Sequence, residues 1–302
     1  MALKQTKVEV NNAVFSLPYY VARDEGYFAE EGIELELVRA GSGRDRDLDV
    51  PDKPIEDHTM VESYGWHRGI EEGEFSLYRA CEWGQIRRTQ DSAKDAKVIS
   101  KRAAVATQAI IVTPDSPVNI PADLKNKTVA VNFHAGSHYV TLGLLGGYLK
   151  RDEIRAVHIG GPKQRFNAIT NGTVDAAAVM EPWVTVAEKL GYKVIAEAYY
   201  DGAEVGTPSL DPEAYAAIDR AIKKAVKKIN EDKTPYLHYL CEEVPAEICT
   251  ITPEDLHTPR LRYIEPRPYT EEEYQYIYDW MTDWNLLDQT SVYDKIIDAK
   301  IA

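Results

Sequence analysis

Two side chains near residue 60 are of the types that bind and protonate small organic acids. Arg68 lies within YGWHRG at 64–69, where aromatic and glycine neighbours would let its guanidinium lie against a flat face and hold a carboxylate or sulfonate through two hydrogen bonds. His58 has an ordinary pKa of about 6.5, so it can hold or release a proton near neutral pH. Both are candidate catalytic residues, and Arg68 is also a candidate ligand-binding residue. The alternatives are a solvent-exposed arginine and a structural histidine.

A second candidate site lies at the start of a predicted helix. Gly136, Ser137 and His138 follow a buried strand pattern, so the first backbone N–H groups of the helix would point outward from the carboxyl end of that strand. Such amides bind anions, and Ser137 could add a hydroxyl while His134 or His138 could add an imidazole. The alternative is that Ser137 only caps the helix. Both roles are compatible, because a cap leaves other N–H groups unpaired.

Three further residues are expected to contact the ligand. Glu181 and Trp183 follow the strand predicted at 175–179, at the carboxyl edge where α/β sheets bind ligands, and Trp183 could stack on a flat molecule. The alternatives are that Glu181 caps the next helix and that Trp183 packs between helix and sheet. Tyr19 begins another predicted helix, and we expect it, rather than Tyr20, to face the cleft.

The sequence predicts neither a metal site nor a cofactor. His134 and His138 form an HxxxH pair, but Gly136 lies between them and the zincin glutamate is missing. P-loop and GxGxxG motifs are also missing from the sequence. Neither a CxxC motif nor an even disulfide framework is formed by the three cysteines, Cys81, Cys241 and Cys249.

Alternating strand and helix patterns would position these residues. The strict apolar/charged alternation of IELELV at 33–38 predicts a strand, preceded by a helix that opens at 16–22 and stops near Gly26. Later strands are predicted at 128–131, 156–159 and 175–179, and helices at 136–149, 163–170, 184–190, 212–230 and 271–287. This alternation is typical of α/β proteins with mainly parallel sheets. Residues 58–95 show no clear pattern.

Length and composition indicate two lobes with a cleft between them. The chain has 302 residues, whereas single cores stop growing at about 250 to 300 residues. We expect residues 1–107 and 195–302 to form lobe 1 and residues 108–194 to form lobe 2. The formal charge of -14 would repel nucleic acid, and no window of the sequence is apolar enough to span a membrane.

The pattern PYYVARDEGYF at 18–28, followed by GIEL at 32–35, resembles the opening of the substrate-binding proteins for sulfonates, nitrate and thiamine-pyrimidine precursors. Further matches follow in order, namely PADLK at 121–125, GS at 136–137, AI at 168–169, GTVDAA at 172–177 and EPW at 181–183. The ordered set is more specific than any one motif. This resemblance implies the type II periplasmic-binding-protein fold, with two α/β lobes, each a mainly parallel sheet flanked by helices, and a ligand cleft between them.

The sequence is also similar, more faintly, to the hydroxybiphenyl sulfinate desulfinases, which are cofactor-free enzymes on the same scaffold. When GIEL at 32–35 is aligned, Ala13 stands where these enzymes have their nucleophilic cysteine, so the resemblance does not imply attack by a thiolate. His58 and Arg68 have the same mutual spacing as the essential histidine and arginine of these enzymes. The resemblance therefore implies catalytic roles for this pair.

These features favour a cofactor-free intracellular lyase or hydrolase, similar to a decarboxylase or desulfinase. In it, Arg68 and the helix end at Gly136 and Ser137 would hold an aromatic acid while His58 delivers a proton. The alternative is a substrate-binding protein that delivers sulfonate, nitrate, pyrimidine-like or aromatic acid solutes to an ABC permease. As written, the sequence has no signal peptide and predicts a cytoplasmic protein. A periplasmic location is expected if a signal was removed.

Overall fold

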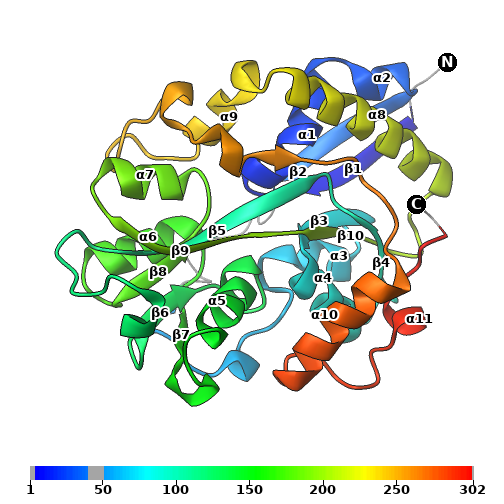
Figure 1. Ribbon diagram of the computed structural model, residues 1–302. Helices are drawn as coiled ribbons and strands as arrows, with labels where there is room; N and C mark the ends of the chain where they lie inside the picture. The colour runs from blue at the N-terminus through cyan, green and yellow to red at the C-terminus, as the bar shows by residue number, and fades with distance from the viewer. Residues whose placement is uncertain (1–3, 40–50, 301–302) are drawn as a thin grey trace.

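The computed structural model describes residues 4–39 and 51–300, in which helices flank mixed β-sheets (Figure 1). The strands are β1 (Lys4–Val10), β2 (Ile33–Arg39), β3 (Leu77–Cys81), β4 (Lys97–Lys101), β5 (Ala104–Val112), β6 (Thr128–Val131), β7 (Arg155–His158), β8 (Ala176–Val179), β9 (Lys193–Tyr200), β10 (Gly202–Gly206) and β11 (Arg262–Tyr263). The α-helices are α1 (Ala13–Asp24), α2 (Tyr27–Glu30), α3 (Arg68–Glu72), α4 (Glu82–Asp91), α5 (Gly136–Gly146), α6 (Pro162–Thr170), α7 (Trp183–Lys189), α8 (Pro212–Glu231), α9 (His238–Cys241), α10 (Glu271–Asp283) and α11 (Tyr293–Ile296).

The sheets combine parallel units with antiparallel return strands. β1 and β2 pair in parallel around α1, as the alternating pattern predicts. β10 pairs antiparallel with both β3 and β4. In the largest sheet β6 is parallel to β7 and β8, whereas β5 is antiparallel to β8, β9 and β11. Parallel βα units therefore bring the carboxyl ends of β6, β7 and β8 to one edge.

The long strands β5 and β9 cross the middle of the molecule (Figure 1). They pair antiparallel from Ala106 opposite Tyr200 to Val112 opposite Lys193. In Figure 1, α1, α2 and α8 lie on one side of these strands and β6, β7 and α5 lie on the other. The expected changes of lobe, at 107/108 and 194/195, fall within β5 and β9.

Helix α1 begins earlier than expected and contains a proline. It starts at Ala13, so Pro18 lies inside the helix rather than near its first turn. Because proline has no N–H, the carbonyl of Val14 loses its helical partner. The hydroxyl of Tyr263 donates a hydrogen bond of 3.2 Å to that carbonyl. A side chain distant in sequence thus replaces the missing helical bond.

Helix α10 ends at Asp283, earlier than the predicted end at residue 287. Asn285 adopts a left-handed conformation with φ of 54°, which ends the helix. The amide of Leu286 then donates a hydrogen bond of 2.8 Å to the carbonyl of Met281. Residues 58–95, which have no clear sequence pattern, contain the fully buried strand β3 and helix α4.

Helix α8 has the predicted amphipathic pattern. Asp211 caps it by accepting a hydrogen bond from the amide of Glu213 at 2.9 Å, and Pro212 occupies the first turn. One face is buried, through residues such as Ala214, Ile218 and Ile222, while lysines lie on the other face. Among the helices in residues 4–39 and 51–300, none is long and apolar enough to cross a membrane.

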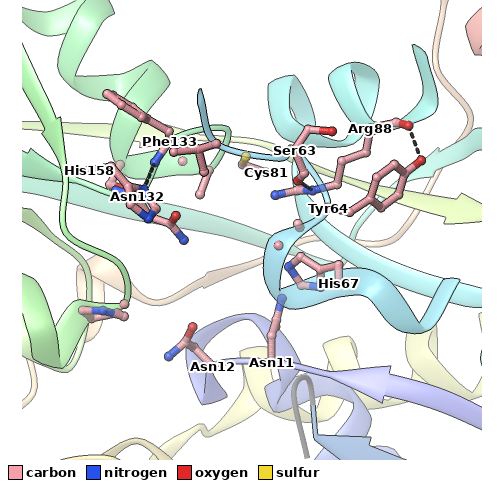
Figure 2. A pocket seen from close by; sticks show the side chains of 18 of the residues that line it. Asn11, Asn12, Ser63, Tyr64, His67, Cys81, Arg88, Asn132, Phe133 and His158 are labelled. Carbon is pink, nitrogen blue, oxygen red and sulfur yellow. Dashed lines mark hydrogen bonds between the residues drawn. The ribbon is translucent and has the colours of Figure 1, made fainter. Parts of the chain in front are cut away.

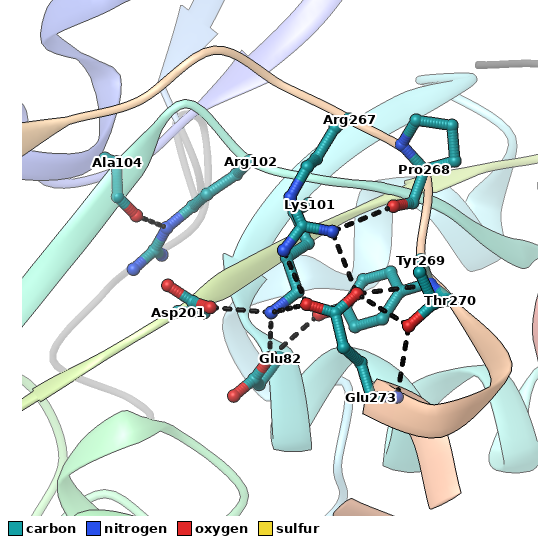
Figure 3. Close-up of polar contacts among 10 residues, drawn as sticks. All are labelled: Glu82, Lys101, Arg102, Ala104, Asp201, Arg267, Pro268, Tyr269, Thr270 and Glu273. Atoms are coloured by element: carbon teal, nitrogen blue, oxygen red, sulfur yellow. Dashed lines mark hydrogen bonds and ion pairs between the residues drawn. The ribbon is translucent and has the colours of Figure 1, made fainter.

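A cluster of charged side chains ties α4 and α10 to the turn after β9 (Figure 3). The ammonium of Lys101 lies 2.6 Å from Asp201, 3.3 Å from Glu273 and 3.8 Å from Glu82. Tyr269 donates a hydrogen bond of 2.9 Å to Glu82. Burial raises the pKa of Glu82 to about 7, although the charge of Lys101 opposes this shift. These contacts fix the end of the crossing strand β9 against two helices.

Candidate functional site

A pocket of about 440 Å³ opens at the carboxyl ends of β1, β3, β6, β7 and β8. Figure 2 shows Asn132 and His158 on one wall, Ser63, Tyr64 and Arg88 on the opposite wall, and Asn11 and Asn12 between them. Further lining residues come from α1, β5, the end of β9, the loop before α5 and the helices α5 and α6, and they include Phe15, Gln108, Phe133, Gly136, Ser137, Arg165 and Tyr200.

The start of α5 lines this pocket, as the sequence predicts. The amides of Gly136 and Ser137 have no acceptor among the described residues. Ser137 is buried, and its hydroxyl accepts a hydrogen bond of 2.9 Å from the amide of Asn132. A Cβ atom on Gly136 would lie 2.6 Å from the hydroxyl oxygen of Tyr200. Glycine therefore lets the helix end approach the pocket wall closely.

Arg165, on α6, brings a buried positive charge to the pocket. Its side chain is 3% exposed, and it donates to the carbonyls of Ala178 at 2.7 Å and Gly160 at 2.5 Å. No carboxylate pairs with it among the described residues. Burial lowers the pKa of Arg165 to about 9, so the guanidinium keeps its charge at neutral pH. This charge is desolvated, and no carboxylate among residues 4–39 and 51–300 compensates it.

Arg88, on α4, is a second buried arginine in the pocket wall. It donates to the carbonyl of Ser63 at 2.7 Å and to that of His134 at 2.9 Å. Its third partner is the side-chain oxygen of Gln85 at 3.4 Å. In the part of the chain that the structure describes, no carboxylate forms an ion pair with Arg88. Arg88 thus holds the loops around residues 63 and 134 together.

Arg68 lines the same pocket as Gly136 and Ser137, but it is exposed and forms an ion pair with Glu62. The structure therefore brings together the arginine and the helix end that the sequence singles out. Because Glu62 already neutralises Arg68, this arginine offers less to an anion than the two buried arginines do.

His58 does not line the pocket and belongs to a separate cluster with His134 and His138. The ring centroids lie 5.7 Å apart for His58 and His134, 5.9 Å for His58 and His138, and 6.1 Å for His134 and His138. Nε2 of His134 donates to the carbonyl of His58 at 2.9 Å. Burial is the main cause that lowers the pKa of each imidazole. All three predicted histidines thus lie outside the pocket wall in the structure.

The described residues contain no group of three or more histidine, cysteine or acidic side chains placed to hold a metal ion. Cys81 lines the pocket, but burial raises the pKa of its thiol. At neutral pH this thiol is therefore protonated and is a poor nucleophile.

Glu181, Trp183 and Tyr19 are buried outside the pocket wall. Glu181 accepts hydrogen bonds from the amide and hydroxyl of Thr185, at 3.2 and 2.8 Å. Trp183 packs against Phe166, with ring centroids 5.4 Å apart. Tyr19 donates a hydrogen bond of 2.9 Å to Glu204. Glu181 and Trp183 thus have the capping and packing roles that were the alternatives for them, and Tyr19 is bonded within the core.

Several pocket residues are not found by reading motifs. His158 ends β7, and Arg165 lies in the helix that follows, so both belong to a βα unit that the sequence does predict. Gln108 lies on β5 and is 1% exposed, and its Nε2 has no hydrogen-bond partner among the described residues. For His158, the position at a strand end is the available signal, because such edges bind ligands in α/β proteins.

Comparison with known proteins supports the predicted family and fold. The model of the NMT1/THI5-like family matches residues 14–50 and 81–231, which is more than half of the chain. No curated protein matches the sequence.

Solved structures with a similar fold share few identical residues with this chain. The alkanesulfonate-binding protein SsuA from Xanthomonas axonopodis pv. citri, bound to MOPS, aligns with a TM-score of 0.72 and 15% identity, covering 97% of this chain and 99% of that one. The CA3427 gene product of Candida albicans, described as having the generic periplasmic binding protein fold, aligns with a TM-score of 0.72 and 13% identity, covering 98% and 97%. The desulfurization enzyme DszB aligns with a TM-score of 0.61 and 14% identity, covering 99% and 97%. These similarities confirm the two-lobed periplasmic-binding-protein fold.

Proposed function

The chain belongs to the NMT1/THI5-like family, and we propose that it binds a small organic anion in the pocket between its lobes, as the substrate-binding protein of an ABC importer. The observation that carries this proposal is Arg165, a buried guanidinium that faces the pocket and has only carbonyl partners among the described residues. SsuA, which has the same fold, is an alkanesulfonate-binding protein. If the protein is exported, it would act in the periplasm and deliver its ligand to a permease.

The charges in the pocket favour an anion over a neutral or cationic ligand. Burying an arginine without a carboxylate costs several kcal/mol of solvation free energy, which an incoming anion would recover. Arg88 and Arg165 both fit this description. Glu62 is the only carboxylate among the described residues that line the pocket, and it pairs with Arg68. The helix end at Gly136 adds partial positive charge in the same place.

The pocket also suits the organic part of such a ligand. Its volume of about 440 Å³ falls within the range of about 300 to 1,000 Å³ that is usual for small-molecule sites. Phenylalanine and tyrosine rings line it, namely those of Phe15, Tyr64, Phe133 and Tyr200. A flat or aliphatic body could pack against these rings while its acidic group meets the arginines.

The side chains expected to catalyse a lyase reaction do not support that activity. His58 packs against other histidines instead of lining the pocket, and its lowered pKa leaves the ring mostly unprotonated near neutral pH, so it has little proton to deliver. Arg68 is paired with Glu62, and the thiol of Cys81 is protonated. DszB is an enzyme with this fold, so a product assay must accompany the binding experiments.

Isothermal titration with benzenesulfonate, benzoate and MOPS tests the proposal, with neutral benzenesulfonamide as the matched ligand. We expect the anions to bind and Arg165→Met to weaken them by about 30-fold or more, because it removes a buried charge partner. The control is Arg155→Met, because Arg155 is exposed, pairs with Glu56 at 2.7 Å and lies outside the pocket wall. Equal affinity for the sulfonamide, or no binding of any organic anion, would overturn the proposal. Turnover of a bound acid would support the lyase activity instead.

A further inference from the structure

His158 is a buried side chain whose position in the pocket wall is fixed on several sides. Its backbone forms an antiparallel β-bridge with Ile55. The amide of His158 donates to the carbonyl of Ile55 at 2.8 Å, and the amide of Ile55 donates to the carbonyl of His158 at 3.3 Å. Its ring packs against Phe133, with centroids 5.6 Å apart, and only 6% of the residue is exposed. Figure 2 shows this ring on the wall opposite Arg88. The imidazole therefore has little freedom to turn.

One hydrogen bond also fixes where the proton of this imidazole lies. Nδ1 accepts the amide N–H of Phe133 at 3.0 Å, so Nδ1 must present its lone pair. In the neutral ring the proton is then on Nε2, for which the described residues offer no acceptor. Burial lowers the pKa of His158 to about 4, and the charge of Arg165 acts in the same direction. The ring is therefore neutral above about pH 5 and can only donate through Nε2.

Arg165 lines the same pocket, and its guanidinium can likewise only donate hydrogen bonds. Among the described residues its acceptors are the carbonyls of Ala178 and Gly160, which leaves other N–H groups of the guanidinium for a ligand. We propose that His158 and Arg165 together form a subsite that only donates hydrogen bonds, and that it selects oxyanions carrying no proton, namely sulfates, sulfonates and carboxylates, over singly ionised phosphate monoesters. This inference rests on the proposed function, because it names the class of anion that the pocket takes.

The physical reason is the proton that a singly ionised phosphate monoester retains. Its P–OH group must donate to an acceptor, but at this subsite it meets the N–H of His158 and the guanidinium of Arg165. A donor placed against donors is left without a hydrogen bond, which lowers affinity by about tenfold to a hundredfold. Asn132, on the same wall, can present either its oxygen or its nitrogen, so His158 is the residue that fixes the preference.

Phenyl sulfate and phenyl phosphate are matched probes, because they have the same shape and differ in this proton. At about pH 5 phenyl phosphate carries one P–OH, whereas at about pH 8 it carries none, since the second pKa of phosphate monoesters is about 6. Titration calorimetry of the wild-type protein at both pH values gives the ratio of the two affinities. We expect phenyl sulfate to bind at least about tenfold more tightly at the lower pH and the ratio to fall at the higher pH. Equal affinities at the lower pH would overturn this inference and leave the proposed function standing.

The variant that assigns the effect to one residue is His158→Gln. A glutamine amide can donate or accept, so this variant should tolerate P–OH and reduce the ratio at the lower pH to about threefold or less. Its affinity for phenyl sulfate reports whether the pocket is intact. His58→Gln is the control, because His58 lies outside the pocket wall, and it should leave the ratio unchanged. An unchanged ratio in His158→Gln would overturn the assignment. If neither probe binds the wild-type protein at either pH, both proposals fail.

Discussion

Gly136 shows how one missing side chain shapes the site. The residue begins α5, and a Cβ atom there would lie 2.6 Å from the hydroxyl oxygen of the pocket residue Tyr200. We predict that Gly136→Ala destabilises the protein by about 1 to 3 kcal/mol and weakens anion binding, because the buried tyrosine must move. The control is Gly143→Ala on the same helix, where a Cβ atom would meet nothing within 4 Å.

Gly143→Ala should be neutral or stabilise the protein by up to about 1 kcal/mol, because alanine favours helices. Chemical denaturation and titration calorimetry of both variants provide the comparison. If the two substitutions change stability and affinity alike, close packing at the helix end is not the reason for glycine at position 136.

At the scale of single residues, local patterns found the helix end but not the arginines. Gly136 and Ser137 can be predicted, because a glycine and a serine after a buried strand are a local signal for a helix start. Arg165 has no such signal, since an arginine in an amphipathic helix is most often solvent-exposed. Tyr19 and Trp183 have the right positions in sequence, but tertiary packing turns both rings into the core. Which face of a helix meets the pocket is therefore a property of the assembled fold.

At the scale of elements, α1 depends on a residue from the far end of the chain. Pro18 leaves the carbonyl of Val14 without a helical partner, and Tyr263 donates to it. We predict that Tyr263→Phe lowers the free energy of unfolding by about 1 to 2 kcal/mol, because it leaves a buried carbonyl unsatisfied.

The double-mutant cycle with Pro18→Ala isolates this contact. Alanine restores the N–H that the Val14 carbonyl lacks, so Tyr263→Phe should cost less than half as much in the Pro18→Ala background. Urea denaturation of the four proteins measures the coupling. A cost that is the same in both backgrounds would contradict a role of Tyr263 as the substitute donor.

Regular elements are the part of this fold that sequence predicts best. The alternation in β2 and the periodicity of α8 depend only on neighbouring residues, and both elements have the predicted bounds to within about two residues. β3 and α4 had no clear pattern, because β3 is buried on both faces and shows no alternation. The sequence pattern predicts a start of α1 near residue 16, three residues later than in the structure, because a distant tyrosine makes an internal proline acceptable there.

At the scale of the whole molecule, buried histidines make stability depend on pH. Burial lowers the pKa of His134 and His158 to about 4 each, against about 6.5 in the unfolded chain. The unfolded state therefore binds more protons as the pH falls below about 6.5, and the stability from these neutral rings is lost progressively toward pH 4. Glu82 acts in the opposite sense, because its raised pKa gives stability that is lost as the pH rises through about 7.

We predict that the free energy of unfolding falls from about pH 6.5 to pH 4.5, and that His134→Gln flattens this slope by at most about 1.4 kcal/mol per pH unit. Denaturant unfolding across this range measures the slope. The matched control is His257→Gln, because His257 is exposed and should not alter it. A slope that His134→Gln leaves unchanged would show that this buried ring is not the group that responds.

The central claim is that an organic anion binds at the buried wall formed by Arg165 and His158 and not at the exposed Arg68. A crystal structure with benzenesulfonate tests this most directly. We predict sulfonate oxygens within about 3 Å of an Arg165 guanidinium nitrogen and of Nε2 of His158. A sulfonate held by Arg68, with Arg165 and His158 still facing no ligand atom, would contradict the account.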